Sequence, residues 1–200
     1  MKLHYSSTSP FTRKVLVCAM ELGLADRIEK LPTNPWESAV ALTHNNPLSR
    51  IPVLINDDGL VLYDSPVICE YLDSLNPDIE LFPTEPDRRW LALRLQALAD
   101  GAGDAAVLRR METQRPDGEQ SPGWIERQAG VTRRALDALE GQVDSWKDQL
   151  TIGQIAVACM LGYLDLRFAG DAWRNSRSKL AEWFTEFEQR PSMAETQPQT

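Results

Sequence analysis

The pattern of this chain changes once, near Pro77, and that change limits the folds available to it. Up to this point short β-branched and aliphatic runs alternate with helix signals, whereas beyond a proline-containing segment at 78–86 the apolar spacing is helical. The sequence therefore predicts an α/β domain at 1–77, a linker at 78–86 and an all-helical domain at 87–200.

The first domain has the predicted order β-α-β-α-β-β-α. The last two strands are joined by Asn56-Asp57-Asp58-Gly59, a sequence typical of a hairpin. Such an order combines a parallel strand pair with a hairpin and supplies helices to cover the sheet. The predicted strands are 3–5, 27–31, 51–55 and 60–63, and the predicted helices are 10–22, 36–42 and 66–75.

Two helices of this domain begin with Ser-Pro, at Ser9-Pro10 and Ser65-Pro66. Serine is a preferred N-cap, and proline suits the first helical position because no N–H is needed there. A helix N-terminus also presents free N–H groups and a partial positive charge, which favour a carboxylate or a thiolate. Two interpretations stay open: the serines only cap their helices, or they also bind an anion.

The predicted helical domain contains a capping box at Thr151-Ile152-Gly153-Gln154. The apolar stripe that follows it predicts the central buried helix of this domain. Further helices are expected from Asp87, at 124–147 and at 178–189, and the polar tail from Ser192 is expected to be disordered or loosely docked.

Charge and composition exclude several functions. A net charge of −8 and a pI near 4.8 argue against a nucleic-acid or anionic-membrane partner. No export signal or membrane span is visible, so a cytoplasmic location is predicted. Cys18, Cys69 and Cys159 are interpreted as small core residues. His4 and His44 are isolated, so no metal is expected.

Three segments, Thr8–Phe11, Asn46–Leu54 and Asp64–Pro66, resemble in order and interval the glutathione-contacting motifs of the glutathione transferase superfamily. The first motif is of the serine type, and the likeness is to soluble bacterial members. The Thr151 capping box resembles the folding signature of that family's helical domain, and the likeness extends over 1–190. It implies a thioredoxin-like first domain, a helical-bundle second domain and a homodimer.

The resemblance also implies which residues act on the thiol of glutathione. Ser9 would stabilise the thiolate of glutathione as the catalytic residue, with Thr8 the second candidate and Ser7 not excluded. Phe11 would help to wall the site. Whether Asp100 or Asp104 of the long helix reaches the site of a neighbouring subunit stays open, and a solvated helix charge is the alternative.

The other two motifs would bind the remainder of the tripeptide. Pro52, after Ile51, would be cis, and the Val53 backbone would pair with the cysteinyl backbone of glutathione. Arg50 would pair with the glycyl carboxylate, for which a guanidinium is well suited, unless it is only a solvated loop charge. Finally, Asp64 and Ser65 would hold the γ-glutamyl end.

The function implied by these motifs is a cytoplasmic glutathione S-transferase that conjugates glutathione to a small, unidentified electrophile, as in detoxification. An alternative is a glutathione-binding regulatory or structural module with little catalysis. Some relatives have Cys where this chain has Ser9, and a serine cannot form a mixed disulfide with glutathione. A thioredoxin-like reductase is disfavoured as well, because the chain has no Cys-x-x-Cys.

Overall fold

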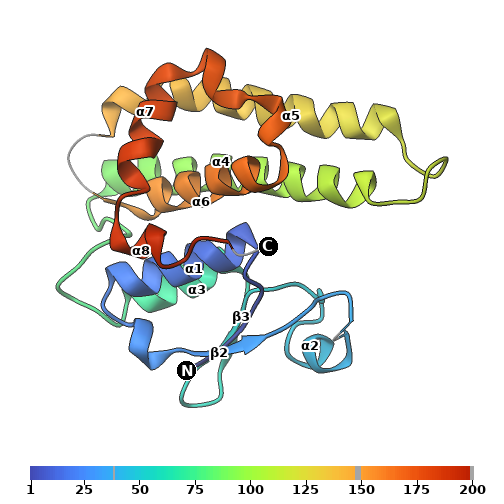
Figure 1. The fold of residues 1–200 in the computed structure, drawn as a ribbon. Helices are drawn as coiled ribbons and strands as arrows, with labels where there is room; N and C mark the ends of the chain where they lie inside the picture. Colours follow the sequence, from blue (N-terminus) through green and yellow to red (C-terminus); the bar gives the residue numbers. More distant parts are fainter. Residues whose placement is uncertain (38, 147–149, 199–200) are drawn as a thin grey trace. The chain divides into compact units, whose positions relative to one another are not determined.

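The structure, a computed structural model, describes residues 1–37, 39–146 and 150–198 (Figure 1). Its contacts divide the chain into two compact units. The sheet unit comprises Met1–Trp90 together with the segment from Pro191, and the helical unit comprises Leu91–Arg190. The division falls inside helix α4 (Pro86–Thr113), later than the linker expected at 78–86.

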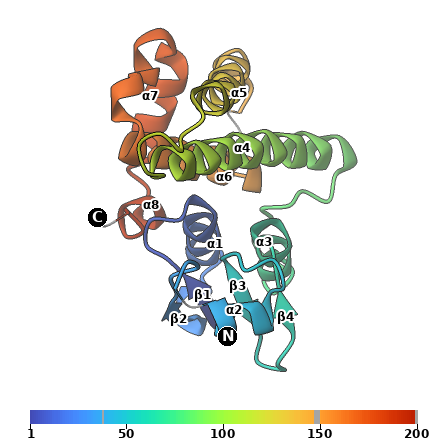
Figure 2. The ribbon, with the colours of Figure 1, turned by 90° about the vertical axis from the view of Figure 1, so that its right-hand side faces the viewer.

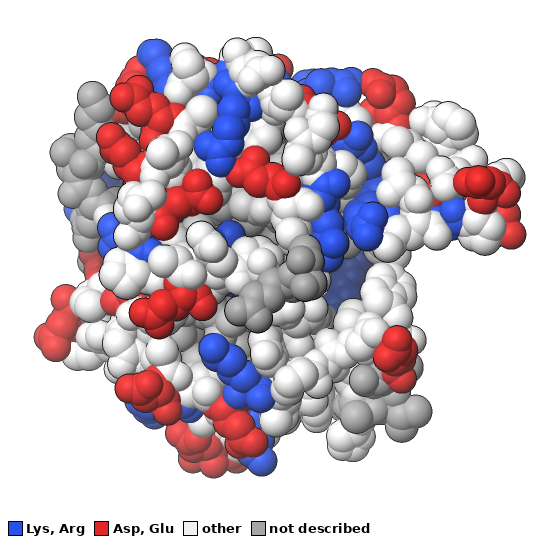
Figure 3. Space-filling view, in the orientation of Figure 1, with Lys and Arg blue, Asp and Glu red and all other residues white. Residues whose placement is uncertain are grey.

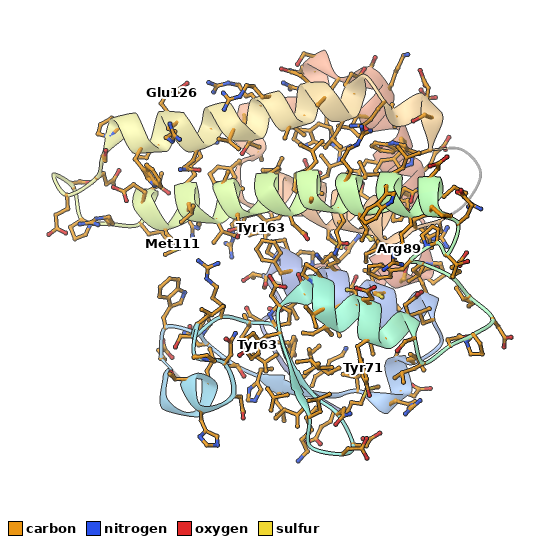
Figure 4. The ribbon with its side chains drawn as sticks, turned by 180° about the vertical axis from the view of Figure 1, so that it is seen from behind. Tyr63, Tyr71, Arg89, Met111, Glu126 and Tyr163 are labelled. Carbon is orange, nitrogen blue, oxygen red and sulfur yellow. The ribbon has the colours of Figure 1, made fainter. Side chains whose placement is uncertain are left out.

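The first turn of α4 belongs to the sheet unit because Arg89 lies in an ion pair with Glu70 of α3 (Ser65–Asp73). Arg89 also lies over the ring of Phe82, 6.0 Å from its centroid. Figure 4 shows Arg89 at this end of α4. These contacts tie the turn to the chain that precedes it.

The sheet unit is a four-stranded mixed sheet with the strand order β2-β1-β3-β4. Strand β1 (Lys2–Tyr5) pairs in parallel with β2 (Glu29–Pro32) and antiparallel with β3 (Val53–Ile55), and β3 pairs antiparallel with β4 (Val61–Leu62). This topology confirms the predicted thioredoxin-like fold, and the hairpin at Asn56–Gly59 is present, with Gly59 at a φ of 84°.

Helices α1 (Pro10–Glu21) and α3 lie side by side over one face of this sheet, and α2 (Ala39–Asn45) lies apart from them (Figure 2). The layer between α1, α3 and the sheet is fully buried at Leu3, Val15, Leu54, Ile68 and Leu72. Each such side chain stabilises the fold by roughly 1.5–3 kcal/mol relative to an exposed position.

Helix α2 begins later than the predicted 36–42, and position 38 lies outside the described residues. The Asn34 side chain accepts a hydrogen bond from the Trp36 N–H at 3.0 Å, and the Glu37 N–H donates to the Asn34 carbonyl. This local turn competes with the helix, because asparagine side chains mimic a backbone turn. Strands β3 and β4 are shorter than predicted, β1 begins one residue earlier than predicted, and β2 is shifted toward the C-terminus.

The helical unit contains the rest of α4 with α5 (Pro122–Glu140), α6 (Ile152–Arg167) and α7 (Ser178–Phe187). Helix α6 is buried along most of its length and starts with the predicted capping box. Helix α5 ends at Glu140, short of the predicted limit at 147, which lies outside the described residues. Short 3-10 helices connect these elements, at Val143–Ser145, Ala169–Asp171 and Trp173–Ser176.

The segment from Pro191 corrects the expectation of a loose tail. It forms the short helix α8 (Pro191–Ala194), in which Met193 is fully buried. The buried guanidinium of Arg13 on α1 donates a hydrogen bond to the Met193 carbonyl at 3.0 Å, and the Ser192 hydroxyl bonds to Glu21 at 2.5 Å. Polar anchors on α1 therefore dock this part of the chain, which composition alone does not reveal.

Within the described ranges, no single helix is both long and apolar enough to cross a bilayer. Helix α6 and the segment Ala169–Ser176 reach that length and apolar content only together, as a pair bent by 96°.

Candidate functional site

The register of the sheet brings the ends of three strands to one edge. His4 near the end of β1 pairs with Val53 at the start of β3, and Leu62 at the end of β4 pairs with Leu54. The loop after β1 leads into α1, the segment before β3 contains Pro52, and the turn after β4 leads into α3. The three predicted motifs therefore meet at the same edge of the sheet.

The N-terminus of α1 is built by the first motif. Ser9 is the N-cap, with extended backbone angles, and its Oγ accepts a hydrogen bond from the Thr12 N–H at 3.2 Å. Capping uses an acceptor lone pair only, so the hydroxyl proton of Ser9 remains a donor for a ligand. Ser6 and Thr8, both half-buried, have their hydroxyls 3.4 Å apart.

The start of α3 differs from the prediction. Asp64, not Ser65, is the N-cap residue, and its side chain makes no capping hydrogen bond. Ser65 is the first helical residue, is only 2% exposed, and is followed by Pro66 in the second position. The Tyr63–Asp64 peptide bond is cis. The helix thus starts one residue earlier than a Ser-Pro pair indicates, and the acidic side chain of Asp64 is exposed beside it.

The second motif is held by a residue to which the sequence assigned no role. Asn46 is 1% exposed; its amide donates to the Arg50 carbonyl at 2.9 Å, and its side-chain oxygen accepts from the Leu48 N–H at 3.0 Å. An Asn before Pro-Leu is a recognisable turn signal. It fixes the backbone of Arg50, whose side chain is exposed.

The Ile51–Pro52 bond is cis, as the family resemblance implies. Ile51 is half-buried, as is Phe11 of the first motif, whereas Val53 exposes no surface. Strand β4 pairs with Leu54 and Ile55 of β3, so the pairing between these two strands ends one residue short of Val53.

The thiols of the chain are not placed as nucleophiles. Cys18, Cys69 and Cys159 are all buried. The Cys18 thiol donates to the Cys69 carbonyl at 3.8 Å. A hydrogen bond with the Cys69 side chain, together with burial, raises the pKa of Cys18 well above its ordinary value. A thiol with a raised pKa is protonated at neutral pH and is a weak nucleophile.

The two histidines have no arrangement suited to a metal. His4 Nδ1 lies 3.0 Å from the Thr33 hydroxyl and its Nε2 lies 3.2 Å from the Asn45 amide, while burial lowers the pKa of His4. Among the residues that the structure describes, no group of three or more His, Cys, Asp or Glu side chains gathers as a metal site.

Two hollows within single units involve other residues. One of about 300 Å³ in the helical unit is lined in part by Thr132, Phe168 and Arg177, and one of about 660 Å³ in the sheet unit by Met1, Asp57 and their neighbours. None of the residues lining these two hollows belongs to the three motifs.

Comparison with known families assigns both parts of the chain. The family described as "Glutathione S-transferase, N-terminal domain" matches residues 8–75, and "Glutathione S-transferase, C-terminal domain" matches residues 122–186. The "Uncharacterized GST-like protein YibF" of Escherichia coli (strain K12) is 36% identical over 202 residues, which cover 99% of this chain and 98% of that protein.

Solved structures agree with this assignment. A glutathione transferase family member from Pseudomonas fluorescens Pf-5, with bound glutathione, has a TM-score of 0.95 at 40% identity and covers 100% of this chain and 99% of its own. A second structure of a family member from the same strain holds S-(propanoic acid)-glutathione, with a TM-score of 0.91 at 39% identity and full coverage of both chains.

Proposed function

The chain belongs to the glutathione transferase superfamily, and we propose that it binds reduced glutathione, holds its sulfur as a thiolate and conjugates it to a small electrophile. The observation that carries this proposal is the convergence of the three motifs at one sheet edge. The bound glutathione of the Pseudomonas fluorescens relative, at 40% identity, supports the ligand.

Ser9 is the proposed catalytic residue. Its hydroxyl donates to the glutathione sulfur while its oxygen remains the cap of α1. The free N–H groups of the first helical turn add a partial positive charge on the same side. Both effects favour the thiolate over the thiol, so they lower the thiol pKa and raise the fraction of nucleophile. Thr8 is the second candidate donor.

The carboxylates of glutathione are proposed to bind at the other two motifs. At the start of α3, the Ser65 hydroxyl and the free N–H groups of the helix would receive the γ-glutamyl carboxylate, with Asp64 near its ammonium group. The exposed guanidinium of Arg50, on the turn that Asn46 fixes, is placed for the glycyl carboxylate. Pro52 and Val53 would align the cysteinyl backbone, and Ile51 and Phe11 would flank it.

The oligomeric state, the cellular location and the physiological role of the enzyme are part of the same proposal. A cytoplasmic homodimer acting in detoxification fits the family. Exposed apolar side chains are available for a subunit contact on the sheet unit, where Trp36 is 70% exposed and Leu48 is 63% exposed. Analytical ultracentrifugation tests this, because a single species with the mass of the monomer would contradict the dimer.

A second candidate function is a glutathione-binding module with little catalysis. The observation that favours it is the capping hydrogen bond of Ser9, whose oxygen accepts from the Thr12 N–H at 3.2 Å and so has a structural role that needs no catalysis. A pocket that binds the tripeptide without aligning its sulfur would give binding but not turnover.

One experiment separates these functions. Isothermal titration calorimetry measures reduced glutathione binding, the ultraviolet absorbance of the thiolate reports its ionisation, and turnover is measured with a neutral aryl halide. The proposal predicts a saturable heat, a thiolate signal at neutral pH and turnover. Binding without the other two signals would favour the module, and the absence of binding would overturn both.

A further inference from the structure

The imidazole of His4 joins three segments of the sheet unit. His4 lies on β1 and is half-buried. Its Nδ1 lies 3.0 Å from the hydroxyl of Thr33, just after β2, and its Nε2 lies 3.2 Å from the amide nitrogen of Asn45, the last residue of α2. Side chains alternate along a strand, and Leu3 is buried in the layer under α1 and α3, so His4 faces the other side of the sheet. A ring nitrogen therefore connects the end of α2 to that side.

The hydrogen bonds around the ring assign its protonation. The Thr33 hydroxyl donates its single proton to the Leu31 carbonyl at 2.9 Å, so toward His4 it can only accept. Nδ1 therefore carries the ring proton and donates it to Thr33. Nε2 is left with a lone pair, which accepts from the Asn45 amide. A neutral ring satisfies both contacts, whereas an imidazolium has no acceptor to offer to Asn45.

The last residue of α2 is followed directly by the Asn46 turn (46–50), which contains Arg50. The Asn46 side-chain amide donates to the Arg50 carbonyl at 2.9 Å, and the Asn46 carbonyl accepts from the Ser49 N–H at 2.9 Å. The Ser49 hydroxyl lies 2.8 Å from that of Thr43 on α2. These bonds join the helix and the turn, so a movement of the end of α2 also moves the backbone of Arg50.

Two different contacts fix α2 on the sheet. Helix α2 lies apart from α1 and α3, as Figure 2 shows, so its own contacts with the sheet decide its position. Leu42 exposes no surface and supplies an apolar contact, which is non-directional. The hydrogen bond between Asn45 and His4 is directional and fixes the end of the helix. Loss of this bond is therefore expected to leave α2 folded while the Asn46 turn becomes less well positioned.

The charges around His4 do not determine its protonation. Burial, and not a neighbouring charge, lowers the pKa of His4, so the ring is neutral at pH 7. On the same side of the sheet, Lys2 on β1 pairs with Glu29 on β2 at 4.0 Å, and β3 places Val53 in register with His4. Helix α2 contributes the exposed imidazole of His44. Figure 3 shows acidic and basic side chains intermixed over the visible face of the sheet unit. The main consequence of protonating His4 is therefore the lost acceptor at Nε2.

We propose that His4 is a positioning residue for the glycyl end of glutathione, because its neutral ring fixes the end of α2 and thereby the turn that carries Arg50. Protonation of Nε2 releases Asn45 and weakens the contact of Arg50 with the glycyl carboxylate. The inference rests on the proposed function and adds to it a pH dependence confined to one end of the ligand. Binding is strongest with neutral His4 and weakens as the pH falls.

The test compares glutathione with its glycyl monoethyl ester, which keeps the γ-glutamyl and cysteinyl parts but has no negative charge for Arg50. Isothermal titration calorimetry measures both Kd values at about pH 7.5 and about pH 5, a range in which histidine titrates while free carboxyl and thiol groups largely do not. We expect the Kd for glutathione to rise about fivefold or more as the pH falls. The Kd for the ester is expected to change by less than about twofold.

Three variants assign the effect to the ring of His4. His4→Phe removes both hydrogen bonds and is expected to bind glutathione at about pH 7.5 as weakly as wild type does at about pH 5. His4→Gln offers Asn45 an oxygen that does not titrate and is expected to bind well at both pH values. The matched control is His44→Gln, which removes the second of the two histidines and is expected to keep the wild-type pH dependence. Circular dichroism verifies that each variant is folded.

A second readout follows the ring itself. Linkage is reciprocal, so a fivefold preference of glutathione for the neutral form lowers the pKa of His4 by about 0.7 unit on binding. Proton NMR of the imidazole as a function of pH measures this pKa, and His4→Gln assigns the signal. The ester is expected to leave the pKa of His4 unchanged. A contact that serves only the stability of the fold would not distinguish the two ligands.

The outcomes separate this inference from the function on which it rests. No saturable binding of glutathione at either pH would contradict the proposed function. Binding with the same pH dependence for glutathione and its ester, or with none, would overturn the role of His4 and leave glutathione binding standing. A pH dependence that persists in His4→Gln would do the same. If His4→Phe does not fold, the wild-type titrations and His4→Gln still decide between these outcomes.

Discussion

Helices α1 and α5 begin in the same way, yet only one of them begins at a candidate site. Ser9-Pro10 and Ser121-Pro122 both start with an extended serine N-cap, and the serine oxygens accept from Thr12 N–H at 3.2 Å and from Trp124 N–H at 3.3 Å. The start of α1 lies where the sheet ends converge, whereas Ser121 lies in an exposed loop after α4. Capping chemistry alone therefore does not create a binding site.

The start of α3 extends this comparison. Its Ser-Pro pair has the same sequence, but Ser65 lies within the helix and Asp64 is the cap. Ser65 is almost fully buried, while Ser9 is half-buried and Ser121 is exposed. The same Ser-Pro pair therefore occurs with three different degrees of serine burial. In each case we expect a different consequence when the hydroxyl is removed.

The largest expected effect is that of Ser9→Ala on the rate of conjugation. Loss of a hydrogen-bond donor to a developing or stored anion typically lowers kcat by about 10²–10³. We expect a fall of about 100-fold in kcat with little change in glutathione affinity, because the hydroxyl acts mainly on the sulfur. Steady-state kinetics and calorimetry measure the two quantities.

Ser121→Ala is the matched control for this variant. Both substitutions remove an N-cap and are expected to lower the free energy of unfolding by about 1 kcal/mol. Only Ser9→Ala is expected to lower kcat. Equal rates in Ser9→Ala and wild type would transfer the donor role to Thr8 or Ser7, which Thr8→Val and Ser7→Ala then distinguish.

Ser65→Ala is expected to act on binding. A hydrogen bond to a charged group contributes about 1.5–3 kcal/mol, and 1.4 kcal/mol corresponds to a factor of ten. We expect the Kd for glutathione to rise at least about tenfold, with kcat at saturation changed by less than about twofold. A variant with unchanged Kd and reduced kcat would reverse the assignments of Ser9 and Ser65.

Thr151→Ala is expected to act on stability alone. The Thr151 hydroxyl accepts from the Gly153 N–H at 3.3 Å, and its loss should lower the stability of the helical unit by about 1 kcal/mol. Urea unfolding followed by circular dichroism measures this change. Thr151→Ser keeps the cap and should retain wild-type stability, and a reduced kcat in folded Thr151→Ala would contradict a purely structural role.

The elements with strong local signals were predicted from the sequence. The capping box at Thr151, the cap at Ser9 and the turn at Gly59 each depend on residues close in sequence, so their chemistry is visible without the fold. The family resemblance, and not the pattern itself, supplied the cis bond at Pro52.

Other features escaped prediction. The docking of Met193 depends on Arg13, which lies 180 residues away, and helix periodicity carries no information about such a tertiary contact. The cap of α3 is Asp64 and not Ser65; because aspartate and serine are both preferred N-caps, the local pattern does not distinguish them.

The most direct measurement for the whole account is the pKa of the glutathione thiol while it is bound to the protein, obtained from thiolate absorbance as a function of pH. A free thiol has a pKa of about 8.5. The bound value is expected to be at least about one unit lower in wild type and in Ser121→Ala, because Ser9 and the α1 terminus stabilise the thiolate. In Ser9→Ala, which keeps only the helix terminus, the value is expected to be closer to that of the free thiol. A bound thiol that titrates like the free one in wild-type protein would contradict the account.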